Sequence, residues 1–217
     1  MAPAELLQIE AGGVALEGAL EIPPGARGLV VFAHGSGSGR LSPRNRFVAR
    51  ALQHDAIATL LLDLLTPIED LDARSRFDTA LLSERLDAAV RWARARPESS
   101  SLPVALFGAS TGAAAALRVA AADRGIASVV SRGGRPDLAG VRALAHVRAP
   151  TLLVVGGLDA AVIELNREAL ERMKCERELQ IVPGATHLFE EPGALEAVAA
   201  LASRWFAAHF PPRMKAA

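Results

Sequence analysis

The sequence predicts an α/β fold: a mainly parallel central sheet with helices on both faces and no large cap domain. Short apolar runs, such as 29–33 and 151–155, alternate along the chain with longer segments whose apolar residues recur every three or four positions. A continuous apolar run is typical of a strand buried on both faces of a parallel sheet. Strands that alternate with helices predict such a sheet, because each parallel crossover usually carries a helix.

Length and charge narrow the possible classes of protein. At 217 residues the chain fits one domain over 1–217, with a frayed tail at about 211–217. The 24 basic and 24 acidic residues cancel, so the basic surface of a nucleic-acid-binding protein is not expected. Every apolar run is shorter than the roughly 18 residues that mark a membrane span, so no membrane association is expected either.

The cysteine content and the first residues bear on the compartment. Cys175 is the single cysteine, so it has no partner for an internal disulfide, which fits a reducing compartment. Residues 1–5 lack the basic stretch followed by an apolar one that marks a signal peptide. We therefore expect a cytoplasmic protein in which Cys175 is a bystander.

The first half of the chain predicts a hairpin and then two buried strands. The expected strands cover 6–10, 14–22, 29–33 and 57–62. The third strand leads into a glycine-rich loop, 34–39, after which Ser42 caps a helix with Pro43 at its first position. Segment 63–76 is expected to be irregular and is too short for a helical cap domain. A long helix through 81–93 follows it.

The second half continues the alternation. The expected strands cover 103–107, 127–131, 151–155 and 179–182. An alanine-rich helix after the first of them is expected to end at Gly125, since glycine readily adopts the left-handed conformation of a helix C-terminus. A polar amphipathic helix through Leu165 and Met173 precedes the last strand, and Pro192 is expected to open a closing helix.

The motif Gly108-Ala109-Ser110-Thr111-Gly112 joins a predicted strand to a predicted helix. A serine on so sharp a turn needs neighbours without bulky side chains two residues before and after it, and both positions hold glycine. The turn is expected to present the Ser110 hydroxyl at the carboxyl end of the sheet. This arrangement puts a poor nucleophile where a base can activate it.

Two further residues complete a candidate catalytic set. Asp159 follows strand 151–155 and His187 follows strand 179–182, so both are expected at the same carboxyl edge as Ser110. Histidine accepts a proton near neutral pH, and a carboxylate holds its tautomer. The pattern predicts Ser110 as nucleophile, His187 as base and Asp159 as the residue that orients it. Asp159 could instead be the N-cap of the helix that follows.

Four segments, 32–39, 107–112, 156–159 and 183–187, carry a resemblance to known proteins. In these segments the chain resembles small α/β-hydrolases of the dienelactone hydrolase-like group, whose catalytic residues follow the order Ser, Asp, His. Dienelactone hydrolases proper are similar to this chain, but they carry cysteine as the nucleophile on the turn between strand and helix (the elbow), where this chain has Ser110. The resemblance thus implies a serine hydrolase that cleaves a small carboxylic ester or thioester through an acyl-enzyme intermediate.

Backbone N–H groups are expected to form an oxyanion hole beside the nucleophile. The first donor is Thr111, directly after Ser110. The second is expected from the loop after strand 29–33, where Ser36 is the first choice and Gly37 the next. In the same loop, His34 is expected to shape the backbone rather than to react.

Two arginines are candidates for substrate binding. Arg132 and Arg135 follow the carboxyl end of strand 127–131 and could clamp a carboxylate with two hydrogen bonds each. They could equally be solvated or paired with a neighbour such as Asp137. The partner expected from the sequence is therefore a small-molecule ester, and the oligomeric state is not predicted.

Two other functions stay open from the sequence. The chain could be an inactive binding protein with a hydrolase fold, which the intact catalytic set argues against. The loop with Gly35, Gly37 and Gly39 follows a strand and could bind a nucleotide as in Rossmann-like proteins, but its spacing is not G-x-G-x-x-G. No group of His, Cys and carboxylate residues has metal-ligand spacing, so neither metal nor cofactor is expected.

Overall fold

The computed structural model describes residues 5–211. Eight strands form one sheet in the order β1-β2-β4-β3-β5-β6-β7-β8, in which β1 and β2 form an antiparallel edge and the other strands run parallel. The strands are β1 (Glu5–Ala11), β2 (Val14–Glu21), β3 (Leu29–Ala33), β4 (Ala58–Leu62), β5 (Val104–Ala109), β6 (Ile126–Arg132), β7 (Thr151–Gly156) and β8 (Arg177–Val182). The predicted tail at 211–217 lies outside the described residues, apart from residue 211.

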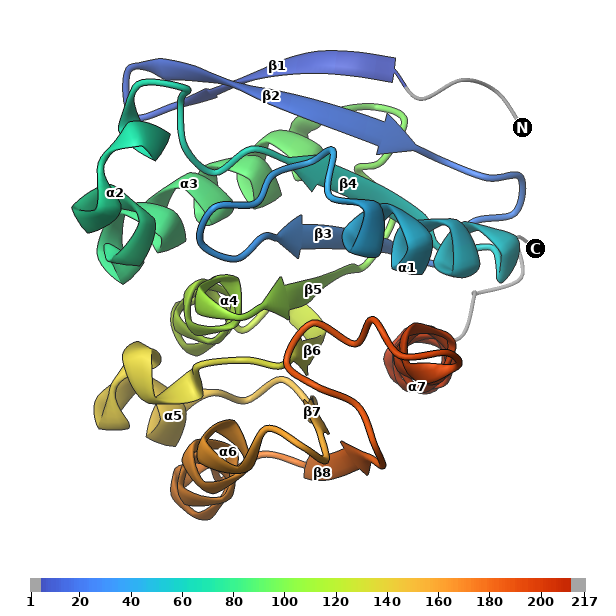
Figure 1. Cartoon of the computed structure of the whole chain (residues 1–217). Helices are drawn as coiled ribbons and strands as arrows, with labels where there is room; N and C mark the ends of the chain where they lie inside the picture. Colours follow the sequence, from blue (N-terminus) through green and yellow to red (C-terminus); the bar gives the residue numbers. More distant parts are fainter. Residues whose placement is uncertain (1–4, 212–217) are drawn as a thin grey trace.

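Helices cover both faces of the sheet, as Figure 1 shows. Helices α1 and α7 pack together on one face, whereas α3, α4, α5 and α6 form a row on the other. The helices are α1 (Pro43–His54), α2 (Ala73–Phe77), α3 (Thr79–Ala95), α4 (Thr111–Ala122), α5 (Val141–His146), α6 (Ala160–Arg172) and α7 (Ala194–His209), with 3₁₀ turns η1 (Glu69–Leu71) and η2 (Pro136–Ala139). The predicted α/β class is confirmed, and no large cap domain is present within residues 5–211.

Each face of the sheet has its own apolar core, because side chains alternate along every strand. In β3, Val30 and Phe32 belong to the core beneath α1 and α7. Val31 and Ala33, which alternate with them, belong to the core beneath α3 and α4. Every residue of β3 is buried, which is why this strand appears in the sequence as a continuous apolar run.

Segment 63–76 contains more regular structure than the irregular chain expected there. It includes η1 and most of α2, a short helix that Asp72 caps by accepting a hydrogen bond from the N–H of Arg74 (2.9 Å). Neither short helix has a buried residue. Apolar periodicity therefore could not have revealed them.

The end of α4 corrects a prediction. The helix ends at Ala122, and the N–H of the C-cap residue Asp123 donates to the carbonyl of Val119 (2.8 Å). Gly125 lies beyond the helix, and its N–H donates to the carboxylate of Asp123 (2.8 Å). The aspartate turn ends the helix before the chain reaches the glycine, so the prediction of a Gly125 cap is wrong.

Two further segments differ from the expected elements. Helix α7 begins at Ala194, after Gly193 with its left-handed φ of 81°, and not at Pro192. The short elements η2 and α5, between β6 and β7, were not predicted. Helix α5 has a single buried residue, Leu144, so it shows no apolar stripe in the sequence.

The parallel register brings the ends of distant segments together at the carboxyl edge of the sheet. Ala109 at the end of β5 pairs with Arg132 at the end of β6, which in turn pairs with Val154. Gly156 at the end of β7 pairs with Val182 at the end of β8. The loops that follow these strands therefore meet at one place, as expected for sheets of this kind.

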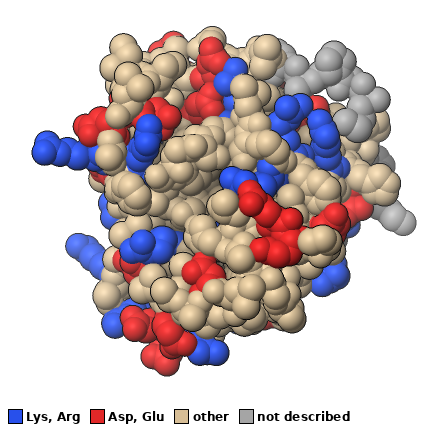
Figure 2. All heavy atoms as spheres, in the orientation of Figure 1, with Lys and Arg blue, Asp and Glu red and all other residues tan. Residues whose placement is uncertain are grey.

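The surface carries both signs of charge. Figure 2 shows acidic and basic side chains interspersed over one face, with a cluster of acidic atoms beside basic ones near its middle. In the described part of the chain, no helix is long and apolar enough to cross a membrane.

Candidate active site

Ser110 lies on a strained turn between β5 and α4. Its φ is 50° and its ψ is −121°, a region that residues with side chains rarely adopt. Its N–H donates to the carbonyl of Arg132 (3.2 Å), and its carbonyl accepts from the N–H groups of Ala113 (3.1 Å) and Arg135 (3.1 Å). These bonds to the strand end, the helix and the following loop hold the turn in place.

The two glycines of the motif are required by close packing around this turn. A Cβ on Gly108 would overlap the backbone of Ala113 in α4, and a Cβ on Gly112 would overlap the carbonyl oxygens of Ala33 and His34 at the end of β3. Helix α4 can therefore begin directly against the sheet only with glycine at both positions. The motif has the steric basis that the sequence predicts.

Asp159 and His187 meet at the ends of β7 and β8. The distance from His187 Nδ1 to Asp159 Oδ2 is 2.6 Å, and the Asp159 side chain is only 16% exposed. Asp159 occupies the N-cap position of α6, yet its side chain makes no capping hydrogen bond. The carboxylate of Asp159 therefore binds His187 and does not cap helix α6. This contact decides between the two alternatives that the sequence left open, a partner of the histidine or a helix cap.

The imidazole of His187 also lies against the loop that follows β6. The position of a Cβ on Gly133 would be 3.5 Å from His187 Cε1. Gly133 directly follows Arg132, whose carbonyl accepts the N–H of Ser110. His187 is thereby placed near the turn that carries Ser110, although the Ser110 hydroxyl has no hydrogen-bond partner within residues 5–211. Such contacts are often loose without substrate.

Glu191 anchors the loop that carries His187, a contact that sequence reasoning missed. Its carboxylate accepts from the N–H (3.0 Å) and the hydroxyl (2.6 Å) of Thr186, and these bonds lower the pKa of Glu191. The neighbouring Glu190 pairs with Arg44 of α1 at 2.9 Å. A carboxylate five residues after a threonine in a loop was the available signal, and it is a weak one.

The glycine-rich loop packs closely around Ser110. A Cβ on Gly35 would lie 2.9 Å from Ser110 Cβ. The N–H of Ser36 donates to Thr111 Oγ1 at 2.9 Å, which ties this loop to the start of α4. The Ser36 N–H is therefore already engaged, whereas that of Gly37 has no acceptor within residues 5–211.

Asp63, a residue that sequence reasoning also missed, holds the far end of this loop. Its Oδ1 accepts from the N–H of Arg40 (2.6 Å), and its Oδ2 accepts from the guanidinium of the same residue (2.6 Å). A Cβ on Gly39 would lie 2.5 Å from Asp63 Oδ1. A carboxylate thus lies against the end of this loop, and a negative charge there gives the Rossmann-like alternative no support.

His34 holds the start of the glycine-rich loop through both of its ring nitrogens. Its Nε2 accepts from the N–H of Leu64 (2.8 Å), and its Nδ1 lies 2.9 Å from the carbonyl of Gly35. Burial lowers the pKa of His34 from its ordinary value of 6.5, because the charged imidazolium would be desolvated. His34 therefore holds the loop through its two ring nitrogens, in agreement with the prediction that it shapes the backbone.

This burial predicts a pH-dependent stability. Below a pH of about 6.5 the unfolded chain binds a proton at His34 that the folded chain excludes, so the free energy of unfolding falls as pH falls. In His34→Gln this part of the pH dependence should disappear, by up to about 1.4 kcal/mol per pH unit. Urea unfolding at two pH values, one below and one above about 6.5, would measure this change in the free energy of unfolding. His54→Gln, at a side chain 90% exposed, should keep the wild-type slope; an unchanged slope in His34→Gln would contradict the assignment.

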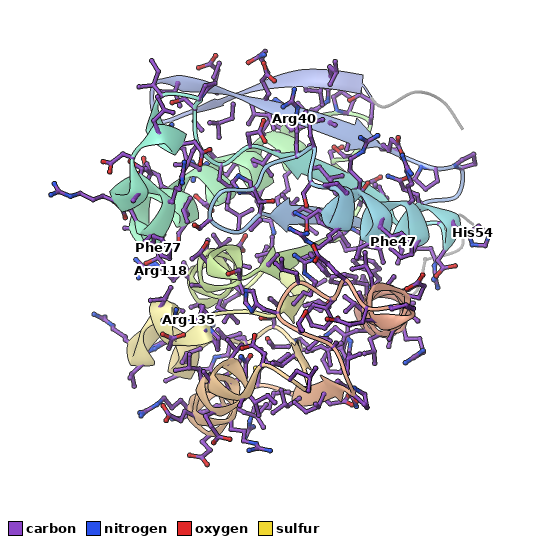
Figure 3. All side chains as sticks on the ribbon, in the orientation of Figure 1. Arg40, Phe47, His54, Phe77, Arg118 and Arg135 are labelled. Atoms are coloured by element: carbon purple, nitrogen blue, oxygen red, sulfur yellow. The ribbon has the colours of Figure 1, made fainter. Side chains whose placement is uncertain are left out.

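The two candidate arginines have different environments. Arg135 forms a double hydrogen bond with Asp137 (2.9 and 2.8 Å), which raises its pKa. This is the pairing that the sequence left open as an alternative, and Figure 3 shows Arg135 on the side of the sheet covered by α5. Arg132 is only 7% exposed, and its Nε and Nη1 are buried without a partner in the described residues.

Ser36, Gly37 and Thr111 line a narrow gap together with Asp70 and Arg76, and this gap is too small to admit a water molecule. A larger hollow of about 610 Å³ lies between α3, α4 and α5, away from the carboxyl edge, so its size does not make it the site of chemistry. Within the described residues, no group of three or more His, Cys, Asp or Glu side chains could hold a metal ion.

The model of the dienelactone hydrolase family matches residues 69–210. The chain belongs to the dienelactone hydrolase family. This match covers the segment from η1 to the end of α7 and includes the elbow and the loops after β6, β7 and β8. The resemblance inferred from the motifs is thereby confirmed.

Two solved structures are similar to this member of the dienelactone hydrolase family. A dienelactone hydrolase from Anabaena variabilis has a crystal structure that superposes with a TM-score of 0.93 at 52% identity, covering 97% of this chain and 100% of that one. A Xanthomonas campestris α/β serine hydrolase without a lid has a TM-score of 0.79 at 19% identity, covering 99% of this chain and 98% of that one. The second likeness concerns the fold alone.

Two Mycobacterium tuberculosis proteins, from strains CDC 1551/Oshkosh and ATCC 25618/H37Rv, are each 54% identical to this chain over 206 residues. Each is provisionally named a phosphoribosyl transferase. The match covers 94% of this dienelactone hydrolase family chain but 46% of each relative. The chain thus spans about half the length of the curated relatives it matches.

Proposed function

We propose that the chain is a serine hydrolase that cleaves a small carboxylic ester or thioester through an acyl-enzyme. The observation that carries this proposal is the hydrogen bond of 2.6 Å between His187 and Asp159, at the edge where Ser110 stands on a strained glycine elbow. Membership of the dienelactone hydrolase family supports hydrolysis as the reaction class.

In the proposed mechanism, Asp159 keeps the proton of His187 on Nδ1, so that Nε2 is free to act as a base. His187 takes the proton of the Ser110 hydroxyl while Oγ attacks the carbonyl carbon, and the carbonyl electron pair moves to oxygen. Collapse of this intermediate expels the alcohol or thiol, which takes the proton from His187. A water molecule activated by His187 then attacks the acyl-enzyme and releases the acid and free Ser110.

Backbone donors would stabilise the oxyanion. The N–H of Thr111 is in the first turn of α4, where no intrahelical acceptor exists. Because the Ser36 N–H is engaged by the Thr111 hydroxyl, the second donor would be the N–H of Gly37, and Ser36 would hold the loop in register. Loss of one such donor typically costs about 10²–10³-fold in rate.

The narrow surroundings of the proposed oxyanion donors support a small substrate. Asp70 and Arg76 limit the space next to Gly37 and Thr111. Leu158 and Leu188, which flank Asp159 and His187, are exposed and give the rim an apolar character. Because the gap beside Gly37 and Thr111 is too narrow for a water molecule, the acyl group would lie along this apolar rim, which favours a short acyl group over a long chain.

The name of the longer relatives does not favour phosphoribosyl transfer at this site. More than half of each relative lies outside the match. The serine, histidine and aspartate at the edge are the groups of acyl transfer.

A fluorophosphonate probe followed by peptide mapping tests the proposal directly. Covalent labelling of Ser110 is expected in the wild type and not in Ser110→Ala. The inactive binding protein that the sequence left open would remain unlabelled while folded, and that result would refute the hydrolase. Circular dichroism of the same sample provides the folding control.

A further inference from the structure

Asn166 is a fully buried polar side chain in the middle of α6. Its Nδ2 donates to the carbonyl of Val162 in the same helix (2.7 Å) and to the carbonyl of Gly134 in the loop after β6 (3.0 Å). Both partners are acceptors, so the amide nitrogen and not the amide oxygen must face them. Because a buried amide without hydrogen bonds is costly, these two bonds hold the side chain in place. The second bond joins α6 to a segment 32 residues earlier in the chain.

The segment that Asn166 reaches, residues 132–135, supports the turn of the nucleophile and is called the support loop below. The carbonyl of its first residue accepts the N–H of Ser110 (3.2 Å), and the N–H of its last residue donates to the carbonyl of Ser110 (3.1 Å). Within this loop, Gly133 lies against the imidazole of His187, whose Cε1 is 3.5 Å from the position of a Cβ on that glycine. The support loop therefore contacts both the nucleophile and the base of the proposed reaction.

Gly134 is held by close packing on its other sides. A Cβ on this residue would overlap Ser131 Oγ in β6 and Ala113 Cβ in α4. The residue thus lies directly against the strand and against the helix that follows Ser110. Within residues 5–211, the amide of Asn166 is the hydrogen-bond donor to the Gly134 carbonyl, so it holds the support loop from the side of α6.

Helix α6 also carries the carboxylate of the candidate site. Asp159 is the residue before its first turn, and Asp159 Oδ2 lies 2.6 Å from His187 Nδ1. The turn η2, which follows the support loop, contacts both α6 and α4, and these helices lie in the same row on one face of the sheet (Figure 1). A shift of α6 relative to α4 would therefore change the distance between the imidazole and Ser110. The bond from Asn166 to Gly134 opposes such a shift.

We propose that Asn166 is a positioning residue for the reaction. By holding Gly134, it fixes the turn of the nucleophile relative to His187 and its carboxylate partner. Proton transfer from Ser110 to His187 needs a separation of about 2.6–3.2 Å between the two heavy atoms. Misplacement by about 1 Å can cost about 10²-fold in rate. This inference rests on the proposed hydrolase, since it concerns the step in which His187 takes the proton of Ser110.

Asn166→Leu, which keeps roughly the size of the side chain and removes both hydrogen bonds, tests this role. With a short-chain nitrophenyl ester, kcat is expected to fall about 10–100-fold, because the nucleophile and the base are no longer held in register. KM should stay within about threefold of the wild type, since an interaction that acts only on the chemical step lowers kcat alone. Labelling of Ser110 by the fluorophosphonate probe should slow in parallel with kcat.

Asn166→Ser provides a second variant that separates the two hydrogen bonds. A serine hydroxyl in a helix can donate to the carbonyl four residues earlier, here that of Val162, but it is too short to reach Gly134 as well. This variant is therefore expected to lower kcat as Asn166→Leu does, with KM again within about threefold of the wild type. If the leucine variant does not fold, the serine variant carries the test.

Gln53→Met is the matched control, because Gln53 is also a buried amide on a helix. Its Nε2 donates to Thr59 Oγ1 (2.7 Å), and its Oε1 has no partner in the described chain, which is also true of Asn166 Oδ1. Thr59 lies near the amino end of β4, at the opposite edge of the sheet from Ser110. Urea unfolding is expected to show a loss of stability in both variants, whereas kcat of Gln53→Met should stay within about threefold of the wild type. A loss of kcat in Gln53→Met equal to that in Asn166→Leu would overturn the proposal, because destabilisation alone would then account for both.

Hydrogen exchange measures the link between α6 and the support loop without turnover. In Asn166→Leu the amides of Gly133 and Arg135 are expected to exchange at least about tenfold faster than in the wild type, while amides of β3 keep their rates. These two amides donate to the carbonyls of Val154 (2.7 Å) and Ser110 (3.1 Å), so they report on the loop directly. Unchanged exchange at both amides would overturn the proposal.

The outcomes of the two proposals are separable. Labelling of Ser110 in the wild type, with kcat of Asn166→Leu and Asn166→Ser within about threefold of it, would leave the hydrolase standing and remove the positioning role. A folded wild type that is neither labelled nor active would refute the hydrolase and the positioning role together. Hydrogen exchange would then still show whether Asn166 holds the support loop.

Discussion

Replacement of Ser110 by alanine is expected to lower kcat for a short-chain nitrophenyl ester by about 10⁴-fold or more. Under the proposed mechanism Oγ forms the covalent bond, so no other group in the site can replace it. The oxyanion donors and bound substrate geometry remain, which leaves a small residual rate above that of water. Steady-state kinetics at saturating ester, with active-site titration of the wild type, would measure the loss.

Ser128→Ala is a suitable control for this change. Ser128 is a fully buried serine of the neighbouring strand β6 whose hydroxyl has no partner in the described chain. It loses the same atom without touching the elbow, so kcat should stay within about threefold of the wild type. Activity of Ser110→Ala within tenfold of the wild type would contradict a serine nucleophile.

Much of the fold could be predicted from the sequence because the central strands are buried on both faces. Strands β3 and β7 consist entirely of buried residues and appear as apolar runs with nearly the right bounds. The missed elements are those whose stability comes from polar caps or from single contacts, such as α2 with its cap at Asp72 and α5 with Leu144. Local apolar periodicity holds no signal for such elements.

The candidate site divides in the same way. Ser110, Asp159 and His187 each follow a predicted strand, so parallel topology alone predicts that they share an edge. The contacts of Asp63 and Glu191, by contrast, depend on how loops fold back on themselves, which spacing does not reveal.

The unpaired burial of Arg132 is a property of tertiary packing. From the sequence, Arg132 and Arg135 are equivalent candidates for binding a carboxylate, because both follow the same strand. The alternation of side chains in β6 buries the first, whereas the turn after it pairs the second with Asp137. Only the three-dimensional structure separates a free cation from a neutralised one.

Replacement of Asp159 by asparagine is expected to lower kcat by about 10³–10⁴-fold. Asparagine has nearly the same shape, but its amide can donate to His187 Nδ1 and thereby favour the tautomer with the proton on Nε2. That tautomer cannot accept the proton of Ser110. The bond of 2.6 Å to the carboxylate is the contact whose chemistry the variant changes. The measurement is kcat on the same ester, with labelling by the fluorophosphonate probe expected to slow in parallel.

The same variant separates this role from that of a helix cap. Asparagine is as good an N-cap as aspartate, so a merely capping Asp159 would tolerate the change with full activity and stability. Asp78 provides the comparison, because its carboxylate accepts from the N–H groups of Ala80 and Leu81 (3.0 Å each) at the start of α3. Asp78→Asn should keep both activity and the free energy of unfolding within about 0.5 kcal/mol. Activity of Asp159→Asn within tenfold of the wild type would show that the carboxylate is dispensable to His187, because a neutral amide in the same position would then orient the imidazole equally well.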